Sequence, residues 1–384
     1  MTVALHGRVV TDYEVWPDGT VLVEGDRVAE VRPEPRAAGE IHEYPNHLIL
    51  PGFVDLQVNG AFGIDAATEP ERLSELSGKL LSTGTTSYLP TVISSPRSLY
   101  RETLPTLADV MKSGVPGAEP LGVHLEGPFV NAKRRGAHPE AHISPPDDAL
   151  LNELLGLAPV RLLTLAPELE GAVDLARAAT ERGVAVSAGH SDASFEVSYE
   201  ALDGAVAGVT HLFNGMSALN HREPGLPGAA FAHPRVVCGL IADGLHVHPE
   251  VISLAFRMLG PDRIHLVTDA IAAAGMGEGE YPLATRRTRL GGDGVPRLED
   301  GTIAGSILTM NEALRNVLAF TGCTVPEAAR MAAATPARLA DERDRKGRLA
   351  PGYDADVTVL GPELSVRAVY KGGDRVYPES RPDR

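Results

Sequence analysis

The middle of the chain alternates short apolar runs with amphipathic stretches of helical period, and most apolar runs stop at a polar residue. The stretch 121–129 shows this well, because its apolar run ends in Glu126 and is then broken by Gly127 and Pro128. That pattern is typical of a buried strand at its C-terminal end. Eight such strands are predicted, at 52–59, 87–92, 122–126, 160–166, 184–190, 208–212, 236–243 and 264–269. Helical patterns lie between several of them, so we predict an α/β fold with a parallel (β/α)8 barrel.

Both ends of the chain carry a different pattern, in which apolar and polar residues alternate with a period of two. Residues 20–28 alternate in this way, as do residues 356–360 and 366–370, and Gly-Asp, Asp-Gly or Gly-Gly turn signals flank them. The two ends therefore predict one small β-sandwich domain, built from residues 1–50 and 345–384. The catalytic barrel is expected to occupy residues 51–344.

Composition narrows the class of protein. The chain has 384 residues, of which 43% are hydrophobic, enough for a barrel with an added module. Its formal net charge of −16 opposes nucleic-acid binding, which needs a basic surface. Cys238 and Cys323 are the only cysteines and lie in apolar surroundings, so no disulfide framework is expected. The first residues show no basic segment followed by a long apolar one, and no apolar run approaches ~18 residues, so we expect no export, a cytoplasmic location and no membrane partner.

The polar residues at the predicted strand ends carry the candidate chemistry, since the C-terminal strand ends of a barrel meet at one rim. They are Gln57, Asn59, Glu126, His190, His211, Asp243, His246 and Asp269. One carboxylate and two imidazoles suffice to hold a catalytic Zn²⁺ or similar ion with a position open for water. Asp269 would then be free to take a proton from that water and pass it to a leaving group.

Each of these residues also has a purely structural explanation. A lone histidine at a strand end is more often a hydrogen-bonding group than a ligand, Glu126 can pair with Arg134 or Arg135, and Asp269 can cap the following helix. Chance placement of all of them at strand ends is far less probable. The joint pattern therefore favours a metal site.

Several motifs resemble those of the N-acetylglucosamine-6-phosphate deacetylase family of the amidohydrolase superfamily. They run in the family's order and comprise 51–60, 124–129, 189–191, 210–214, 222–225, 242–247, 267–270 and 304–306. The resemblance implies that Glu126, His190 and His211 bind one divalent metal ion per subunit and that Asp269 is the proton shuttle. Zn²⁺ is the expected ion, with Fe²⁺, Co²⁺ and Mn²⁺ as alternatives.

The resemblance also implies a set of residues around an amino-sugar phosphate. They are Ala137, His138, Asn214, Gly215, Arg222, Asp243, Gly244, Leu245, His246, Ile303, Ala304 and Gly305. Many relatives in the wider superfamily carry His-x-His on the first strand for a second metal, where this chain has Gln57-x-Asn59. That departure favours a single tightly bound ion, leaves a weak second ion open, and allows Gln57 to support the metal's water.

The implied activity is removal of the acetyl group from N-acetyl-D-glucosamine 6-phosphate, in amino-sugar catabolism and cell-wall sugar recycling. The family resemblance further implies a homodimer, in which Arg222 reaches the neighbour's phosphate. Two alternatives stay open: an amidohydrolase for another N-acyl sugar phosphate or an N-acyl amino acid, and a non-catalytic sugar-phosphate binding protein. The sequence does not distinguish gluco from galacto substrates.

Overall fold

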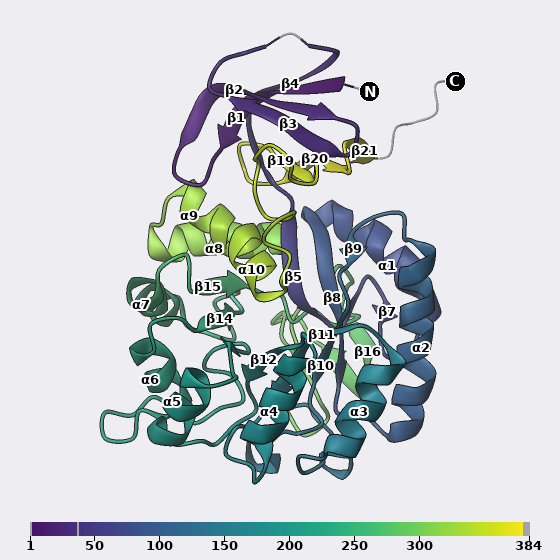
Figure 1. Cartoon of the computed structure of the whole chain (residues 1–384), viewed down its shortest axis with the longest axis vertical. Helices are drawn as coiled ribbons and strands as arrows, with labels where there is room; N and C mark the ends of the chain where they lie inside the picture. The colour runs from purple at the N-terminus through teal and green to yellow at the C-terminus, as the bar shows by residue number, and fades with distance from the viewer. Residues whose placement is uncertain (1, 37, 379–384) are drawn as a thin grey trace.

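The computed structural model describes residues 2–36 and 38–378, and its larger part is a barrel of parallel strands (Figure 1). The eight strands appear in the predicted order and pair along one hydrogen-bonded path. They are β5 (Phe53–Val58), β8 (Thr85–Ile93), β10 (Val123–Glu126), β11 (Val160–Leu165), β12 (Ala185–Ala188), β13 (Gly208–Val209), β14 (Val237–Leu240) and β15 (Ile264–Leu266). The short strand β9 (Glu119–Pro120) pairs with β8. The (β/α)8 prediction is confirmed.

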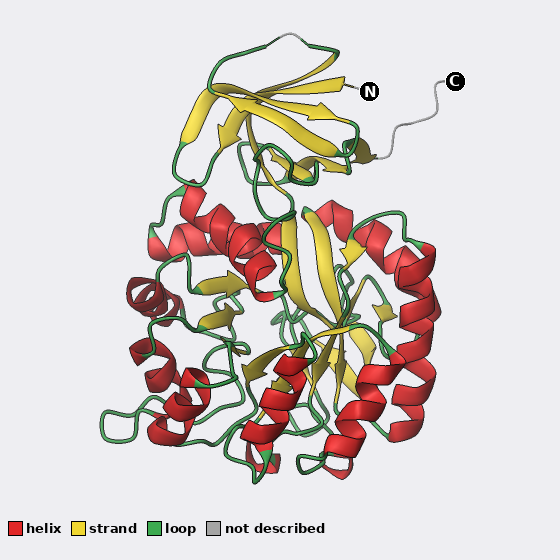
Figure 2. Ribbon diagram, viewed as in Figure 1, coloured by secondary structure: helices red, strands yellow, loops and turns green. Residues whose placement is uncertain are grey.

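Helices surround these strands on the outside, as Figure 2 shows. They are α1 (Leu73–Leu80), α2 (Arg97–Ser113), α3 (Asp148–Leu157), α4 (Ala172–Glu181), α5 (Phe195–Asp203), α6 (Gly225–Ala232), α7 (Pro249–Leu259), α8 (Met310–Thr321), α9 (Val325–Ala329) and α10 (Thr335–Leu339). Their local sequence explains their ends, since α8 begins at a capping box of Thr309 and Glu312 and ends before Gly322, which has φ of 69°. Within the described residues, no helix combines the length and apolarity needed to cross a membrane.

The barrel has a seam where its first and last strands meet. The hydrogen-bonded path runs from β5 to β15, and these two strands do not form a ladder with each other. A single bridge between Val58 and Ala270 joins the two sides, and the backbone N–H of Asn59 donates to the carbonyl of Ala270 over 2.8 Å. The seam therefore brings the end of β5 against the segment that follows β15.

Both ends of the chain form a separate, mostly antiparallel sheet of seven strands, seen above the barrel in Figure 1. In spatial order they are β21 (Asp374–Tyr377), β20 (Val366–Lys371), β19 (Val357–Leu360), β4 (Glu40–Pro51), β1 (Thr2–Val10), β2 (Val15–Glu24) and β3 (Arg27–Arg32). Residues from both ends, such as Leu5, Val21, Val357 and Ala368, share a core distinct from that of the barrel. This is the small β-sandwich domain expected from the sequence.

An insertion after the eighth barrel strand was not expected. Before α8 begins, the chain forms a three-stranded antiparallel sheet of β16 (Gly279–Leu283), β17 (Arg286–Leu290) and β18 (Pro296–Arg297). A two-stranded sheet, β6 (Gly60–Ala61) and β7 (Ile64–Asp65), follows β5. Both insertions follow the C-terminal end of a barrel strand, and the active site of such a barrel lies at that end.

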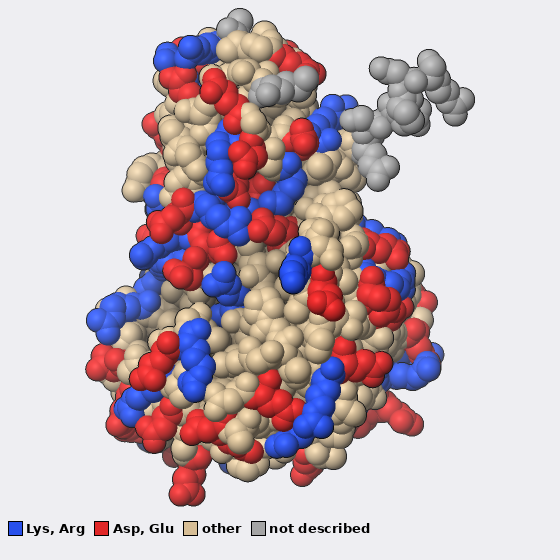
Figure 3. Space-filling view, turned by 45° about the vertical axis from the view of Figure 1, so that its right-hand side comes forward, with Lys and Arg blue, Asp and Glu red and all other residues tan. Residues whose placement is uncertain are grey.

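Charged side chains of both signs gather where the small β domain meets the barrel (Figure 3). Lys346 is only 1% exposed there, and its Nζ lies 2.6 Å from a carboxylate oxygen of Glu119 and of Asp356. Lys371 also pairs with both acids, at 2.9 Å and 2.8 Å. Because Glu119 belongs to β9 whereas Asp356 and Lys371 belong to the small domain, this ion cluster links the two parts.

Candidate metal centre and active site

The predicted site residues lie at the C-terminal rim of the barrel, and most of them follow a strand instead of belonging to it. Glu126 is the last residue of β10, whereas His190, His211 and Asp269 come two or three residues after β12, β13 and β15. Their φ angles of 47°, 30° and 50° fall in the left-handed region that side-chain-bearing residues rarely adopt. These strands are shorter than predicted, because that conformation ends the ladder. Such strained positions cluster at functional sites.

Three side chains bring one atom each to a common point. Glu126 Oε1 lies 3.1 Å from His190 Nε2 and 2.9 Å from His211 Nε2, and the two nitrogens are 3.1 Å apart. All three side chains are buried. A carboxylate and two imidazoles form a ligand set that Zn²⁺ and related ions accept. The residues present therefore fit one metal ion.

The tautomer of His190 supports this arrangement. Its Nδ1 lies 2.9 Å from the carbonyl oxygen of Arg134. A carbonyl only accepts, so Nδ1 carries the proton and Nε2 of the neutral ring points a lone pair toward Glu126. Two electron-rich atoms at 3.1 Å repel unless a cation lies between them. Arg134 is itself held by Asp192 at 2.7 Å, and Lys133 pairs with the same carboxylate, so this basic segment is tied to the site.

His138 is a further imidazole beside Glu126, and its hydrogen bonds give it the opposite tautomer. The backbone N–H of Ser94 donates to His138 Nδ1 over 3.2 Å, so the proton of the neutral ring is on Nε2. Nε2 lies 3.9 Å from Glu126 Oε2 and has no hydrogen-bond partner among the described residues. Burial lowers the pKa of His138 well below its usual value, which keeps the ring neutral.

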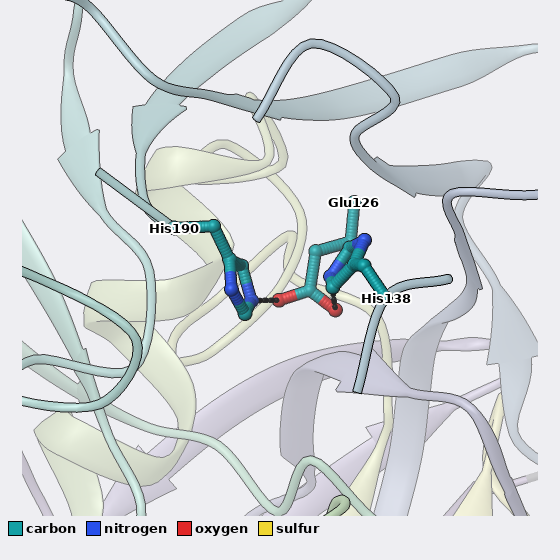
Figure 4. A group of neighbouring side chains, drawn as sticks. All are labelled: Glu126, His138 and His190. Atoms are coloured by element: carbon teal, nitrogen blue, oxygen red, sulfur yellow. Dashed lines mark hydrogen bonds and ion pairs between the residues drawn. The ribbon is translucent and has the colours of Figure 1, made fainter. Parts of the chain in front are cut away.

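Figure 4 shows Glu126 between His138 and His190, and the ligand atoms of these three residues are close enough to hold an ion. The two histidines nevertheless differ in chemistry. His190 offers a lone pair at Nε2, whereas His138 presents a hydrogen there. The set with His211 in place of His138 is therefore the better ligand set, and His138 suits a hydrogen-bond donor.

The two carboxylates of the site have opposite pKa shifts. Burial opposes ionisation of Glu126, but the interactions with the imidazoles of His190 and His211 outweigh it and hold the pKa of Glu126 well below its usual value. Burial, followed by the negative charge of Glu126, raises the pKa of Asp269 to about 6. Glu126 therefore stays ionised while Asp269 can exchange a proton near neutral pH, as a general acid–base group must.

Two amides near the end of β5 connect these carboxylates. Gln57 Nε2 donates to Glu126 Oε1 over 2.9 Å and to Asp269 Oδ1 over 3.1 Å. Asn59 Nδ2 donates to the same oxygen of Asp269 over 2.8 Å. The support of Gln57 for the metal's water stays a prediction.

His246 is fixed by Asp243. Its Nδ1 lies 2.6 Å from Asp243 Oδ2, while Asp243 Oδ1 accepts the backbone N–H groups of Leu245 and His246, each at 2.8 Å. Since a carboxylate accepts, Nδ1 of the neutral ring donates, and Nε2 is left as an acceptor. That tautomer suits a hydroxyl of a sugar.

Most of the side chains described above line a cavity of about 320 Å³. The predicted site residues on its wall are Glu126, Ala137, His138, His190, His211, Asn214, Gly215, His246, Asp269, Ile303 and Gly305. Off the wall lie Gln57, Arg222, Asp243, Gly244, Leu245 and Ala304. Arg222 and Leu245 are exposed. Among the described residues no lysine or arginine lines the cavity.

Sequence reasoning did not assign several residues of the cavity wall. They are Ile93, Gly136, Ile241, Leu283 and Thr302. Leu283 and Thr302 come from the region of the unexpected insertion, and nothing in the local sequence indicates that it folds back over the rim. Asn59 also lies on the wall. The sequence had marked it as a candidate rim residue, because it is a polar residue at the end of an apolar strand, but had given it no catalytic or binding role.

Comparison with known proteins agrees with this fold and rim. Residues 48–376 match the Amidohydrolase family, so the chain belongs to the amidohydrolase family. Members of this family are metal-dependent hydrolases, and the cluster described above is the candidate metal site of this one.

Within that family, the chain is similar to deacetylases of amino-sugar phosphates over nearly its whole length. It is 37% identical to N-acetylglucosamine-6-phosphate deacetylase of Bos taurus, covering 98% of this chain and 95% of the relative. It is 36% identical to N-acetylgalactosamine-6-phosphate deacetylase of Escherichia coli O157:H7, covering 97% and 99%. The solved structure of N-acetyl-D-glucosamine-6-phosphate deacetylase from Mycobacterium smegmatis, in complex with N-acetyl-D-glucosamine-6-phosphate, superposes with a TM-score of 0.91 at 31% identity, covering 98% and 99%.

Proposed function

We propose that this chain removes the acetyl group from N-acetyl-D-glucosamine 6-phosphate, giving D-glucosamine 6-phosphate and acetate, in amino-sugar metabolism. The observation that carries the proposal is the convergence of Glu126, His190 and His211 on one point, beside a separate carboxylate at Asp269. A non-catalytic binding site has no need of that separate carboxylate with a pKa of about 6. The family and the relatives support the same reaction.

We assign Glu126, His190 and His211 as ligands of one divalent ion, with Zn²⁺ as the native metal. When bound, Zn²⁺ acts as a Lewis acid that lowers the pKa of water and polarises the amide carbonyl. The remaining steps belong to side chains. Asp269 accepts a proton from the attacking water, and the Nε2–H of His138 donates to the carbonyl oxygen as it gains negative charge. Asp269 then returns the proton to the nitrogen, so the C–N bond breaks to give the amine and acetate.

The phosphate needs a cationic group, and no lysine or arginine in the described part of the chain lines the cavity. Asn214 and Gly215 lie on the cavity wall. The backbone N–H of Asn214 donates to the carbonyl of His211 over 2.9 Å, so the backbone N–H of Gly215 is the one proposed to donate to a phosphate oxygen. Arg222 is exposed and off the wall, so as part of the proposal it acts on the cavity of a second subunit. Its guanidinium offers the bidentate geometry that a phosphate group accepts.

A homodimer is therefore part of the proposal, and exposed apolar residues support it. Leu254 and Met258 are 54% and 55% exposed, and they lie four residues apart on the same face of α7. Leu245, just before α7, is 55% exposed. The proposed location is the cytoplasm, with which the two buried free cysteines agree.

N-acetylgalactosamine 6-phosphate is the second candidate substrate, because the relative that acts on that epimer is as similar to this chain as the others are. The two sugars differ only in the orientation of one hydroxyl. Because Nδ1 of His246 is bonded to Asp243, its Nε2 can accept a hydrogen bond from that hydroxyl in one epimer and not in the other.

The test is acetate release by metal-stripped and Zn²⁺-restored protein from both phosphorylated epimers and from unphosphorylated N-acetylglucosamine. We expect Zn²⁺ to restore turnover, with N-acetylglucosamine 6-phosphate as the best substrate. Faster turnover of N-acetylgalactosamine 6-phosphate would make that epimer the substrate and leave the proposed metal site and mechanism unchanged. Stoichiometric zinc without turnover of any amino sugar would overturn the proposed function.

A further inference from the structure

Asn59 lies at the barrel seam, next to Asp269, the proposed proton carrier of the site. Its backbone N–H donates to the carbonyl of Ala270 over 2.8 Å, and the N–H of Gly60 donates to the same carbonyl over 3.1 Å. On the other side, the N–H of Ser306 donates to the carbonyl of Asp269 over 2.8 Å. The backbone around Asp269 is therefore pinned from two directions by residues outside β15.

The side chain of Asn59 adds a contact to the carboxylate itself. Its Nδ2 donates to Asp269 Oδ1 over 2.8 Å, and Gln57 Nε2 donates to the same oxygen over 3.1 Å. The amide orientation of Asn59 follows from this partner, because the reversed amide would place oxygen against oxygen. Among the described residues, none donates to Asp269 Oδ2.

We propose that Asn59 is a positioning residue for the reaction, and that it acts through Asp269. A carboxylate turns easily about its last torsion, which has a broad, roughly two-fold preference. Two N–H groups on Oδ1 remove that freedom and leave Oδ2 as the oxygen that carries the proton between water and the leaving nitrogen. This inference rests on the proposed function, and it assigns a purpose to an asparagine that only its place at a strand end had marked.

The competing explanation is that Asn59 only stabilises the barrel seam through its backbone hydrogen bond to Ala270. Asn59→Ala separates the two, because it removes Nδ2 but keeps the backbone N–H that binds Ala270. We expect kcat to fall about 10- to 100-fold, as when a group that orients an active-site ligand is lost, while KM changes less than about twofold and zinc affinity is unchanged. A purely structural role would lower the thermal midpoint with kcat preserved.

Thr91→Val is the matched control. Thr91 is buried, and its hydroxyl accepts the N–H of Val58, the residue before Asn59, so its loss disturbs the same strand without reaching Asp269. We expect kcat within about twofold of wild type. An equal fall of kcat in Thr91→Val and Asn59→Ala would overturn the inference.

A double-mutant cycle with Asp269→Asn tests the route of action. If Asn59 acts through Asp269, Asn59→Ala costs little further rate once Asp269 has lost its proton-carrying role. Equal fold-losses with and without Asp269→Asn would show that Asn59 acts elsewhere.

Crystal structures of zinc-loaded wild type and Asn59→Ala supply a readout that does not need turnover. We expect the Asp269 carboxylate to rotate or to adopt two conformers in Asn59→Ala. A carboxylate fixed in the same orientation in both structures overturns the inference about Asn59. Absence of wild-type turnover on any amino-sugar phosphate overturns the proposed function instead.

Discussion

At the scale of single residues, the site depends on which ring nitrogen of each histidine carries the proton. The carbonyl of Arg134 leaves His190 with a lone pair at Nε2, whereas the N–H of Ser94 leaves His138 with a hydrogen there. Two neutral imidazole rings thus differ in what they can do, because His190 Nε2 can bind a metal ion whereas His138 Nε2–H can donate a hydrogen bond. Small residues allow these rings to pack closely, and Gly215 is the clearest case, with φ of 57° and its backbone against the ring of His190.

Gly215→Ala tests this packing. A Cβ at Gly215 would lie 2.8 Å from His190 Nδ1 and 3.4 Å from the Arg134 carbonyl, so the ring must move away from the common point. We expect zinc affinity, measured by competition with a chelating dye, to fall about 10- to 100-fold. Gly322→Ala is the control, since Gly322 has a φ of 69° with open space around its Cβ. Equal zinc affinity in Gly215→Ala and wild type would contradict the explanation.

At the scale of elements, short strand β9 connects the barrel with the small domain. Its Glu119 pairs with Lys346, Lys371 and Arg345 at 2.6 Å, 2.9 Å and 2.7 Å. Burial opposes ionisation of Glu119, but these three cations outweigh it and lower its pKa. A lowered folded-state pKa means that ionised Glu119 stabilises the folded protein above the unfolded-state pKa of about 4.3, and that this contribution is lost as pH falls below it.

Glu119→Gln is expected to lower the unfolding free energy at pH 7 by about 1 to 3 kcal/mol, because it leaves buried Lys346 with fewer partners. Urea unfolding at pH 7 and at pH 4 measures this, and the difference from wild type should shrink at the lower pH. Glu153→Gln is the control, since Glu153 pairs with Arg97 and Arg101 on the surface. A difference that grows on acidification would reverse the assigned sign.

At the scale of the whole molecule, no lysine or arginine of residues 2–36 and 38–378 lines the cavity, and α7 exposes an apolar face. Both features have one explanation in the proposed homodimer. Soluble monomers do expose single apolar residues, so the pairing of Leu254 with Met258 on one face is the informative part.

The variant Leu254→Glu with Met258→Glu is expected to be monomeric by light scattering after size exclusion, where the wild type is dimeric, because a buried unpaired carboxylate is costly. If Arg222 serves the partner's cavity, KM for the phosphorylated sugar should rise at least tenfold in the monomer. Val197→Glu on α5, where Val197 is 39% exposed, is the control. A wild-type monomer with full activity would rule out the shared site.

Local sequence patterns were enough to predict the order of the eight strands, the β domain from both ends and the polar residues of the rim. Buried strands need short runs of apolar residues, and the polar residues that carry the chemistry follow where each run stops. Both patterns can be seen in a short stretch of sequence. Tertiary structure alone decided the tautomers of His138 and His190, since Ser94 and Arg134 are far from them in sequence. It also placed Leu283 on the cavity wall and brought Asn59 against Asp269 across the seam. Such contacts depend on how distant segments pack, which no local periodicity encodes.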